Sequence, residues 1–166
     1  MTGTVIDLAA IEEIRQLKYR YFRSLDLKLW DVFADTLAED VVGNYGTHAY
    51  GEPLHFTGRD AIVEFMTARL GREVTTVHVA NHPEITIDGD TAVASWCFED
   101  TVIATQHRIL IRGAGYYTDH YTRGTDGAWR ITEIAYERIF ESMQSLDDTP
   151  SYQLIANRWS GADTPP

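Results

Sequence analysis

Cysteine is nearly absent from this sequence, since Cys97 is the single example. One cysteine excludes an internal disulfide, and it is compatible with the reducing cytoplasm, which is the location that we expect. Long apolar runs are also lacking, and no stretch approaches the ~18 consecutive apolar residues of a membrane span. Residues 1–7 contain neither a basic start nor an apolar stretch, so we expect no signal peptide.

Basic residues are scarce as well. The sequence has 14 Lys and Arg against 25 Asp and Glu, which gives a formal net charge of -11. Such a charge repels phosphate backbones and argues against a nucleic-acid partner. Arg69 and Arg72 could provide local basic charge for an anionic substrate, but complementing the dipole at the end of a predicted helix is the simpler interpretation.

The residues that are present fit one domain with one core, because 44% of the 166 residues are hydrophobic. Between Asp7 and Asp26, apolar residues recur at steps of three and four, which predicts an amphipathic helix. Two shorter helices are expected, one over 30–37 and one that begins near Thr57 and ends at Gly71.

Strand patterns dominate from Val74 onward. They predict strands over 82–88, 91–100, 115–123 and 129–140, with less distinct ones near 41–45 and 53–56. Helices followed by long strands and tight turns predict an α+β fold, with a strongly curved antiparallel sheet wrapped around the N-terminal helices to leave one deep pocket. We expect a domain over 1–146 and a tail over 147–166, which could cover the pocket, pack on a neighbouring subunit or be partly disordered.

His78 and Asp100 are the first candidate site residues. A hairpin centred on Gly89 pairs residues whose numbers add to 178, which places these two side chains opposite each other on one face. A carboxylate beside an imidazole fixes its tautomer and raises its basicity, as a general base requires. An ordinary cross-strand ion pair is the alternative, and the pattern alone favours it slightly.

Tyr21 and Asp26, at the end of the first predicted helix, are further candidates. Packing in the helix core and capping of the helix end are the simpler roles for them. Trp96 and Phe98 share a strand face with Asp100, whereas Cys97 alternates away from it, so nucleophilic catalysis is not indicated. The other histidines have no metal-ligand spacing, and we expect no metal site.

Several strings in the sequence together resemble a known family. They are Tyr21-Phe-Arg-Ser-Leu-Asp26, His78 before His82-Pro-Glu-Ile-Thr-Ile-Asp88, Trp96-Cys-Phe-Glu-Asp100, Tyr117-Thr-Asp119 before Tyr121, and Glu137-Arg-Ile-Phe-Glu141. They run in order through about residues 10–142 and are similar to the SnoaL-like branch of the nuclear-transport-factor-2-like superfamily. Within that branch the chain resembles the bile-acid 7α-dehydratases.

The resemblance implies a cone-shaped α+β barrel and a carbon–oxygen lyase that needs no cofactor. It carries a catalytic set over to Tyr21, Asp26, His78 and Asp100. We expect His78 to be the general base, held by Asp100, and Asp26 to position Tyr21 or the imidazole. Tyr21 is expected to protonate the departing hydroxyl or to hold the enolate oxygen. The residues expected to bind substrate are Phe22, Tyr45, Trp96, Phe98, Tyr117 and Arg138.

The expected substrate is apolar and ring-containing, a hydroxylated 3-oxo-4-ene steroid or its coenzyme A thioester. The acidic composition gives no independent support for the thioester. A ketosteroid-isomerase-like isomerase and a non-catalytic binding or dimerisation module are the alternatives. We also expect a homo-oligomer, a dimer or trimer, formed through the outer face of the sheet.

Overall fold

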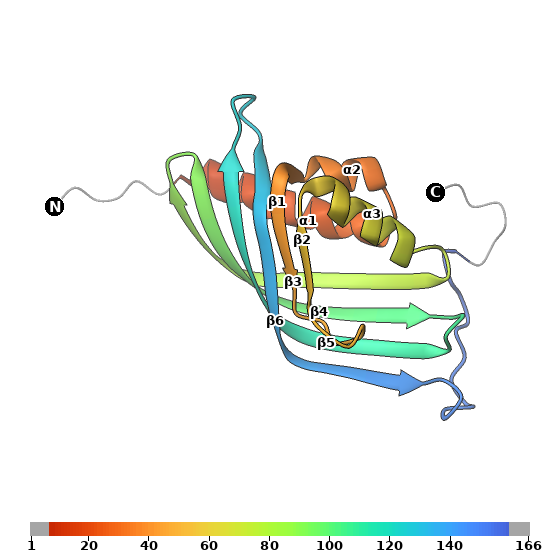
Figure 1. Cartoon of the computed structure of the whole chain (residues 1–166). Helices are drawn as coiled ribbons and strands as arrows, with labels where there is room; N and C mark the ends of the chain where they lie inside the picture. The colour runs from red at the N-terminus through yellow and green to blue at the C-terminus, as the bar shows by residue number, and fades with distance from the viewer. Residues whose placement is uncertain (1–6, 160–166) are drawn as a thin grey trace.

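A strongly curved sheet carries helices on its inner side (Figure 1). The computed structural model describes residues 7–159. Its helices are α1 (Leu8–Asp26), α2 (Trp30–Asp35) and α3 (Arg59–Arg69). Its strands are β1 (Leu37–Tyr45), β2 (Leu54–Thr57), β3 (Val74–Asp88), β4 (Thr91–Ala104), β5 (Ile109–Arg123) and β6 (Trp129–Ser145). The predicted α+β fold with N-terminal helices is confirmed.

The strand order is β2-β1-β6-β5-β4-β3. Every pair is antiparallel except β1 with β6, which is parallel. The prediction of an antiparallel sheet therefore missed one pair. The reason is that β6, at the end of the β3–β6 meander, lies beside a strand from the start of the chain, and no local turn dictates the direction of that pairing.

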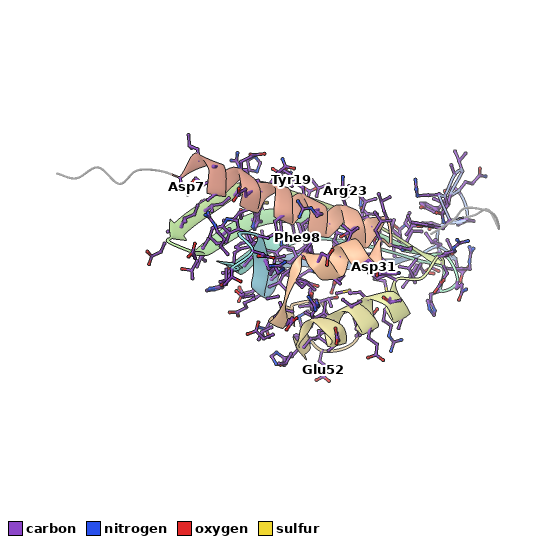
Figure 2. The ribbon with its side chains drawn as sticks, turned by 90° about the horizontal axis from the view of Figure 1, so that it is seen from above. Asp7, Tyr19, Arg23, Asp31, Glu52 and Phe98 are labelled. Atoms are coloured by element: carbon purple, nitrogen blue, oxygen red, sulfur yellow. The ribbon has the colours of Figure 1, made fainter. Side chains whose placement is uncertain are left out.

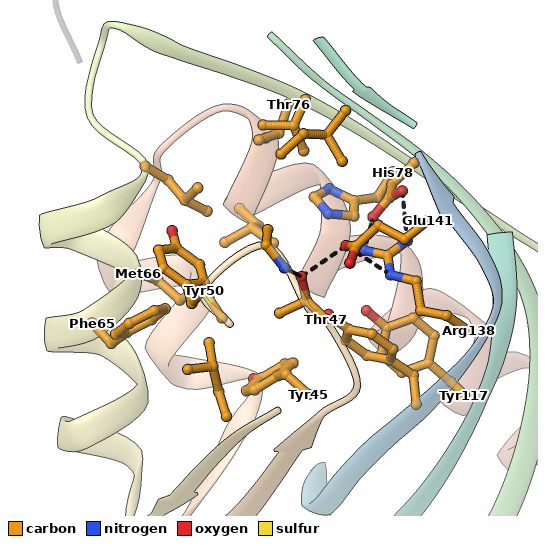
Figure 3. Close-up of a pocket in the computed structure, with 18 of the residues that line it drawn as sticks. Tyr45, Thr47, Tyr50, Phe65, Met66, Thr76, His78, Tyr117, Arg138 and Glu141 are labelled. Carbon is orange, nitrogen blue, oxygen red and sulfur yellow. Dashed lines mark hydrogen bonds and ion pairs between the residues drawn. The ribbon is translucent and has the colours of Figure 1, made fainter. Parts of the chain in front are cut away.

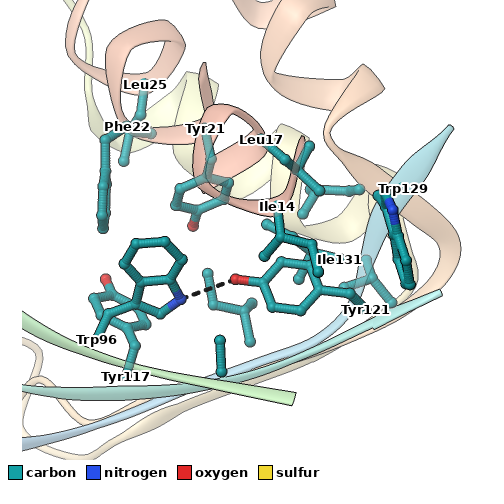
Figure 4. Packing of buried hydrophobic residues seen from close by; sticks show 14 of the residues in the cluster. Ile14, Leu17, Tyr21, Phe22, Leu25, Trp96, Tyr117, Tyr121, Trp129 and Ile131 are labelled. Carbon is teal, nitrogen blue, oxygen red and sulfur yellow. Dashed lines mark hydrogen bonds between the residues drawn. The ribbon is translucent and has the colours of Figure 1, made fainter. Parts of the chain in front are cut away.

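Helix α1 forms where its apolar stripe predicts. Asp7 caps it, because the Asp7 side chain accepts a hydrogen bond of 3.0 Å from the amide of Ala10. Its inner face buries Ile14, Leu17 and Tyr21 against the sheet. Figure 4 shows these residues facing Trp96, Tyr121 and Ile131 across the core. In Figure 2, Tyr19 and Arg23 lie along the outer side of α1, and Phe98 lies inside the molecule.

Irregularities in the strands decide which side chains face inward, and two of them lie near the site. In β3 the pairing with β4 shifts between Asn81 and Glu84. In β6 the pairing with β5 shifts so that Arg138 and Phe140 oppose consecutive residues, which leaves Ile139 as a bulge. Each shift exchanges the inner and outer sets of side chains along the strand, because alternation has a period of two.

The tail is described as far as Trp159, and residues 160–166 of the predicted tail, like residues 1–6 of the predicted domain, lie outside the described part. Asn157 accepts a hydrogen bond of 3.0 Å from Thr75 at the start of β3. The indole of Trp159 is 7% exposed and lies 5.1 Å from the Lys28 amine. Up to Trp159, no tail residue lines the cavity described below. Among the described helices, none is long and apolar enough to cross a membrane.

Candidate active site

A cavity of about 130 Å³ lies between the end of α1, helix α3, the β1–β2 loop and the inner face of the sheet. Its wall is mostly aromatic and aliphatic. The polar side chains that reach it are Thr47, Thr76, His78, Asp100, Arg138 and Glu141. Figure 3 shows Thr47, Glu141 and Arg138 close together, with His78 beside them and Phe65 and Met66 of α3 across the cavity. An apolar cavity with a few convergent polar groups is the usual form of a small-molecule site.

The imidazole of His78 is held by Asp26. Its Nδ1 lies 2.7 Å from Asp26 Oδ1, and its own backbone amide donates to Asp26 Oδ2 at 2.9 Å. Thr76 donates a third hydrogen bond to the same carboxylate at 2.8 Å. An ionised carboxylate only accepts, so Nδ1 carries the proton and Nε2 is left as a base. The ring of Phe22 stacks on the imidazole at 5.3 Å and 4° and fixes its plane.

Of the two carboxylates expected beside His78, Asp100 first and Asp26 second, the structure places the second against the imidazole. His78 and Asp100 are paired across β3 and β4, as the register prediction states. However, Asp100 binds Arg138 rather than the imidazole, through bonds of 2.8 Å and 2.7 Å to the two terminal nitrogens. The reason is competition, since a guanidinium offers a bidentate fit to a carboxylate and Asp26 reaches His78 from the helix side. Base and orienter therefore come from different elements.

Asp26 occupies an unusual position for an acid, because it is the last residue of α1. Negative charge at a helix C-terminus opposes the helix dipole. The three hydrogen bonds from β3 outweigh that cost. The Asp26 side chain therefore does not cap the helix but binds Thr76 and His78 of β3.

Arg138 and Asp100 form an ion pair at the cavity wall with side chains 9% and 4% exposed. Burial opposes the charge of Arg138, but the hydrogen bonds and charge of Asp100 outweigh it and raise the pKa of the guanidinium. Gly113 makes room for this pair, since a Cβ there would lie 2.0 Å from an Arg138 nitrogen. Because Asp100 and Glu141 both flank the guanidinium, what Arg138 offers a developing oxyanion is a fixed N–H donor rather than an uncompensated positive charge.

Tyrosine hydroxyls line the cavity as donors. The hydroxyls of Tyr21 and Tyr45 lie 3.2 Å apart. Burial raises the pKa of both, as it does for Tyr117, and it raises the pKa of Tyr136 to about 12. All four therefore stay protonated at neutral pH and can donate a proton or a hydrogen bond, but cannot serve as bases there.

The predicted wall residues divide into two groups. Tyr45, Tyr117 and Arg138 line the cavity. Trp96, Phe98 and Phe22 do not line it, so substrate contact by these three stays a prediction. Trp96 is fully buried and donates to the Tyr121 hydroxyl at 3.0 Å. Phe98 packs behind Tyr117 at 4.6 Å, and Phe22 covers the opposite side of the His78 ring. Aromatic type alone does not distinguish a wall from the core behind it.

Sequence reasoning missed Glu141 and Thr47, which both reach the cavity. Glu141 lies in a string that the resemblance quotes, so a signal was present. Simple alternation, however, places it on the opposite face from Arg138. Within residues 7–159, no three His, Cys, Asp or Glu side chains are grouped closely enough to hold a metal ion.

The fold has solved relatives at low sequence identity. A candidate scytalone dehydratase from Novosphingobium aromaticivorans superposes with a TM-score of 0.72 at 18% identity, over 91% of this chain and 93% of its own. A candidate aromatic ring hydroxylase from the same organism gives 0.73 at 21% identity, over 87% and 99%. The hexachlorocyclohexane dehydrochlorinase LinA-type3 of Novosphingobium barchaimii gives 0.70 at 14% identity, over 82% and 91%.

Identities this low establish a shared fold alone. The family assignment rests on sequence, because residues 7–135 match the model of the SnoaL-like domain. That match covers α1 through the first part of β6 and includes the His78–Asp26 pair and Asp100, but it ends before Arg138 and Glu141. The chain belongs to the SnoaL-like domain family.

Proposed function

We propose that this chain is a cofactor-independent lyase, a dehydratase that eliminates water from a hydroxylated ring compound by general acid–base catalysis. The observation that carries the proposal is the 2.7 Å contact between His78 Nδ1 and Asp26 Oδ1 at the wall of a largely apolar cavity. It leaves Nε2 as the one basic position of an oriented imidazole.

The proposed reaction begins at a C–H bond that a conjugated ketone acidifies. His78 Nε2 takes this proton, and Asp26 stabilises the imidazolium that forms. The released electron pair moves into the conjugated system, which becomes an enolate, and Arg138 and the tyrosine hydroxyls stabilise its oxygen. The enolate then expels the hydroxyl group, which leaves as water with a proton from Tyr21 or Tyr45. Each positioned acid or base contributes about 10²–10⁴-fold.

The substrate that the sequence resemblance points to is a 3-oxo-4-ene steroid, as in bile-acid 7α-dehydratases. A cavity of 130 Å³ is smaller than the pocket for several fused rings that the resemblance predicts, and drug-sized ligands occupy about 300–1,000 Å³. A second hollow of about 480 Å³ adjoins it, and the two share Tyr50, Leu70 and Ile111 as wall residues. We propose that the reacting ring enters the inner cavity and the remaining rings, or a thioester chain, occupy the outer hollow.

Two of the structural relatives support elimination chemistry by their names, one a dehydratase and one a dehydrochlorinase. Both reactions remove a proton and a leaving group from neighbouring carbons. That chemistry suits one base, acid donors and a shielded cavity, which are the groups found around His78.

Mass spectrometry of candidate substrates tests the proposal. Hydroxylated 3-oxo-4-ene steroids, free and as coenzyme A thioesters, and smaller hydroxylated cyclic enones are incubated with the parental protein, with His78→Ala and with His120→Ala as a control. We expect loss of water with the parental and His120 variants only. A product of unchanged mass with a shifted double bond would instead identify an isomerase. Binding of these compounds without any conversion would identify a binding module.

A further inference from the structure

The loop between β1 and β2, residues 46–53, forms one side of the cavity. Thr47, Ala49 and Tyr50 of this loop line it. The loop leaves β1 through Gly46, where a Cβ would lie 2.3 Å from the Tyr136 carbonyl oxygen, so only glycine passes this close to β6. The loop is short and exposed over much of its length, so its position depends on what ties it to the sheet.

Glu141 of β6 provides such a tie. Its Oε1 accepts a hydrogen bond of 2.8 Å from the Thr47 hydroxyl, and its Oε2 accepts one of 2.7 Å from the His48 amide. The Thr47 hydroxyl also accepts from the Ala49 amide at 3.2 Å, which extends the contact along the loop. Both oxygens of one carboxylate are thus used to hold the loop against the cavity.

The same carboxylate contacts Arg138. Glu141 Oε1 lies 3.2 Å from Arg138 Nε, at an angle that makes an ion pair but no hydrogen bond. The other two guanidinium nitrogens are bound to Asp100. The side chains of Arg138 and Glu141 are 9% and 13% exposed, so solvent screens this attraction only weakly. Figure 3 shows the continuous chain of contacts from Thr47 through Glu141 to Arg138.

A bulge makes this arrangement possible. Residues three apart on a regular strand point to opposite faces, so Arg138 and Glu141 would lie on opposite sides of the sheet. The extra residue at Ile139, which is 71% exposed, restores Glu141 to the inner face. The bulge lies between Arg138 and Glu141, and bulges at such positions commonly change the face to which a functional side chain points.

We propose that Glu141 is a positioning residue that couples closure of the 46–53 loop to the orientation of Arg138. The inference rests on the proposed function for the use of Arg138, but not for the coupling itself. When the loop is closed, Glu141 is held in place and fixes the guanidinium from the side opposite Asp100. Since coupling is reciprocal, a ligand that engages Arg138 also stabilises the closed loop.

Amide hydrogen exchange at His48 and Ala49 tests the coupling without any substrate. Glu141→Gln keeps the shape of the side chain but removes its charge, and we expect exchange at His48 to become about 10–100-fold faster. Glu137→Gln, on the exposed side of the same strand, is the matched control and should leave this exchange unchanged. Unchanged exchange in Glu141→Gln would overturn the proposal.

Arg138→Met tests the other direction. If Glu141 bridges the two groups, loss of the guanidinium should speed exchange in the loop by about threefold or more while amides in the β4–β5 core remain protected. Faster exchange everywhere would indicate a damaged fold, in which case Arg138→Lys, which keeps the charge, replaces it and should give an intermediate effect. If amide exchange in the loop is as slow in Arg138→Met and Arg138→Lys as in the parental protein, the coupling is ruled out.

Turnover of a substrate found by the mass-spectrometric screen separates this inference from the proposed function. Thr47→Val should raise KM several-fold, Thr47→Ser should restore it, and Glu141→Gln should lower kcat as well, by about tenfold. If no compound is converted, the proposed function fails, whereas the exchange measurements still decide whether Glu141 couples the loop to Arg138. A kcat for Glu141→Gln equal to the parental value would remove the positioning role.

Discussion

The two halves of the curved sheet use the same kinds of residues for different purposes. Beneath the first turns of α1 the interior is filled, and the buried pair Lys18–Asp119, with an N–O distance of 2.7 Å, is 0% exposed at both side chains. Toward the end of α1 the interior is hollow, and the polar groups of His78 and Arg138 face the cavity at 11% and 9% exposure. Polar groups in the filled half act on the stability of the fold, whereas those in the hollow half can meet a ligand.

The filled half shows how one oxygen of a buried carboxylate is bonded, while the other, Asp119 Oδ1, is buried without a hydrogen-bond partner among the described residues. Asp119 accepts from Lys18 at 2.7 Å and from the Tyr121 hydroxyl at 2.8 Å, and Tyr121 in turn accepts from Trp96. The Lys18 amine also lies 3.7 Å from the centre of the Tyr117 ring. Burial lowers the pKa of Lys18 and raises the pKa of Asp119, while the partner charge opposes each shift. The comparison predicts that substitutions in one half change stability and those in the other change turnover.

The largest effect is expected for His78→Ala in the hollow half. Turnover of an identified substrate should fall about 10²–10⁴-fold, because the base is lost. The free energy of unfolding should change by less than about 2 kcal/mol, since the side chain borders a cavity rather than a packed core. Parallel kinetics and urea unfolding check both parts. Parental turnover in this variant would show that His78 is not the base.

Lys18→Met should have the opposite profile. Removing one partner of a buried ion pair leaves an uncompensated charge, at a cost of about 3–5 kcal/mol of folding free energy. The double variant Lys18→Met with Asp119→Leu should recover most of that loss. Urea unfolding of the three proteins measures it. A single variant that is as stable as the parental protein would mean that the filled half tolerates an unpaired carboxylate.

The pH dependence of Lys18→Met sharpens the comparison. Burial already raises the pKa of Asp119 above 3.8, and the variant lacks the amine that opposes this rise. Between pH 3.8 and the raised value, the folded variant keeps a proton that the unfolded chain has lost. Its stability should therefore fall as pH rises through that window, by about 1.4 kcal/mol per pH unit. The double variant, which lacks Asp119, is the reference, and equal slopes would contradict the prediction.

Asp26→Asn should lower turnover by about 10–10²-fold, less than His78→Ala, because the imidazole stays but loses its orienting charge. The two losses should be far from additive in the double variant, as expected for groups that act as one unit. Asp100→Asn should affect turnover by a separate route, because Asp100 holds Arg138 rather than the imidazole. If a double-mutant cycle shows that the losses from Asp26→Asn and His78→Ala are additive, the two side chains do not act as one unit.

The smallest effect concerns assembly. We propose that the outer face of the sheet packs on a second copy, because Val77, Val79 and Phe140 are 54%, 46% and 51% exposed around one shallow hollow there. Val79→Lys with Phe140→Lys should convert an oligomer to a monomer and change turnover by less than about twofold. Light scattering checks this, and a parental protein that is monomeric at micromolar concentration would remove the proposal.

The register of the β3–β4 hairpin shows which part of the site could be predicted from the sequence and which part could not. Next to the two-residue turn, Asp88 pairs with Thr91, and the paired numbers add to 179 rather than 178. That register would place Asp100 opposite Val79. The irregularity between Asn81 and Glu84 changes the sum to 178 for the residues farther from the turn. His78 therefore pairs with Asp100 as predicted, but because of this irregularity and not because of the turn.

Local patterns in the sequence by themselves determined α1, the order of helices and strands, and the inner face of β4. These follow from periodicity, capping and turn residues, which act over a few positions. Only the tertiary structure decided that Asp26 rather than Asp100 orients His78, and that Arg138 and Glu141 share a face. These contacts depend on two bulges and on a helix end meeting a strand 52 residues away, and neither leaves a periodic trace in the chain.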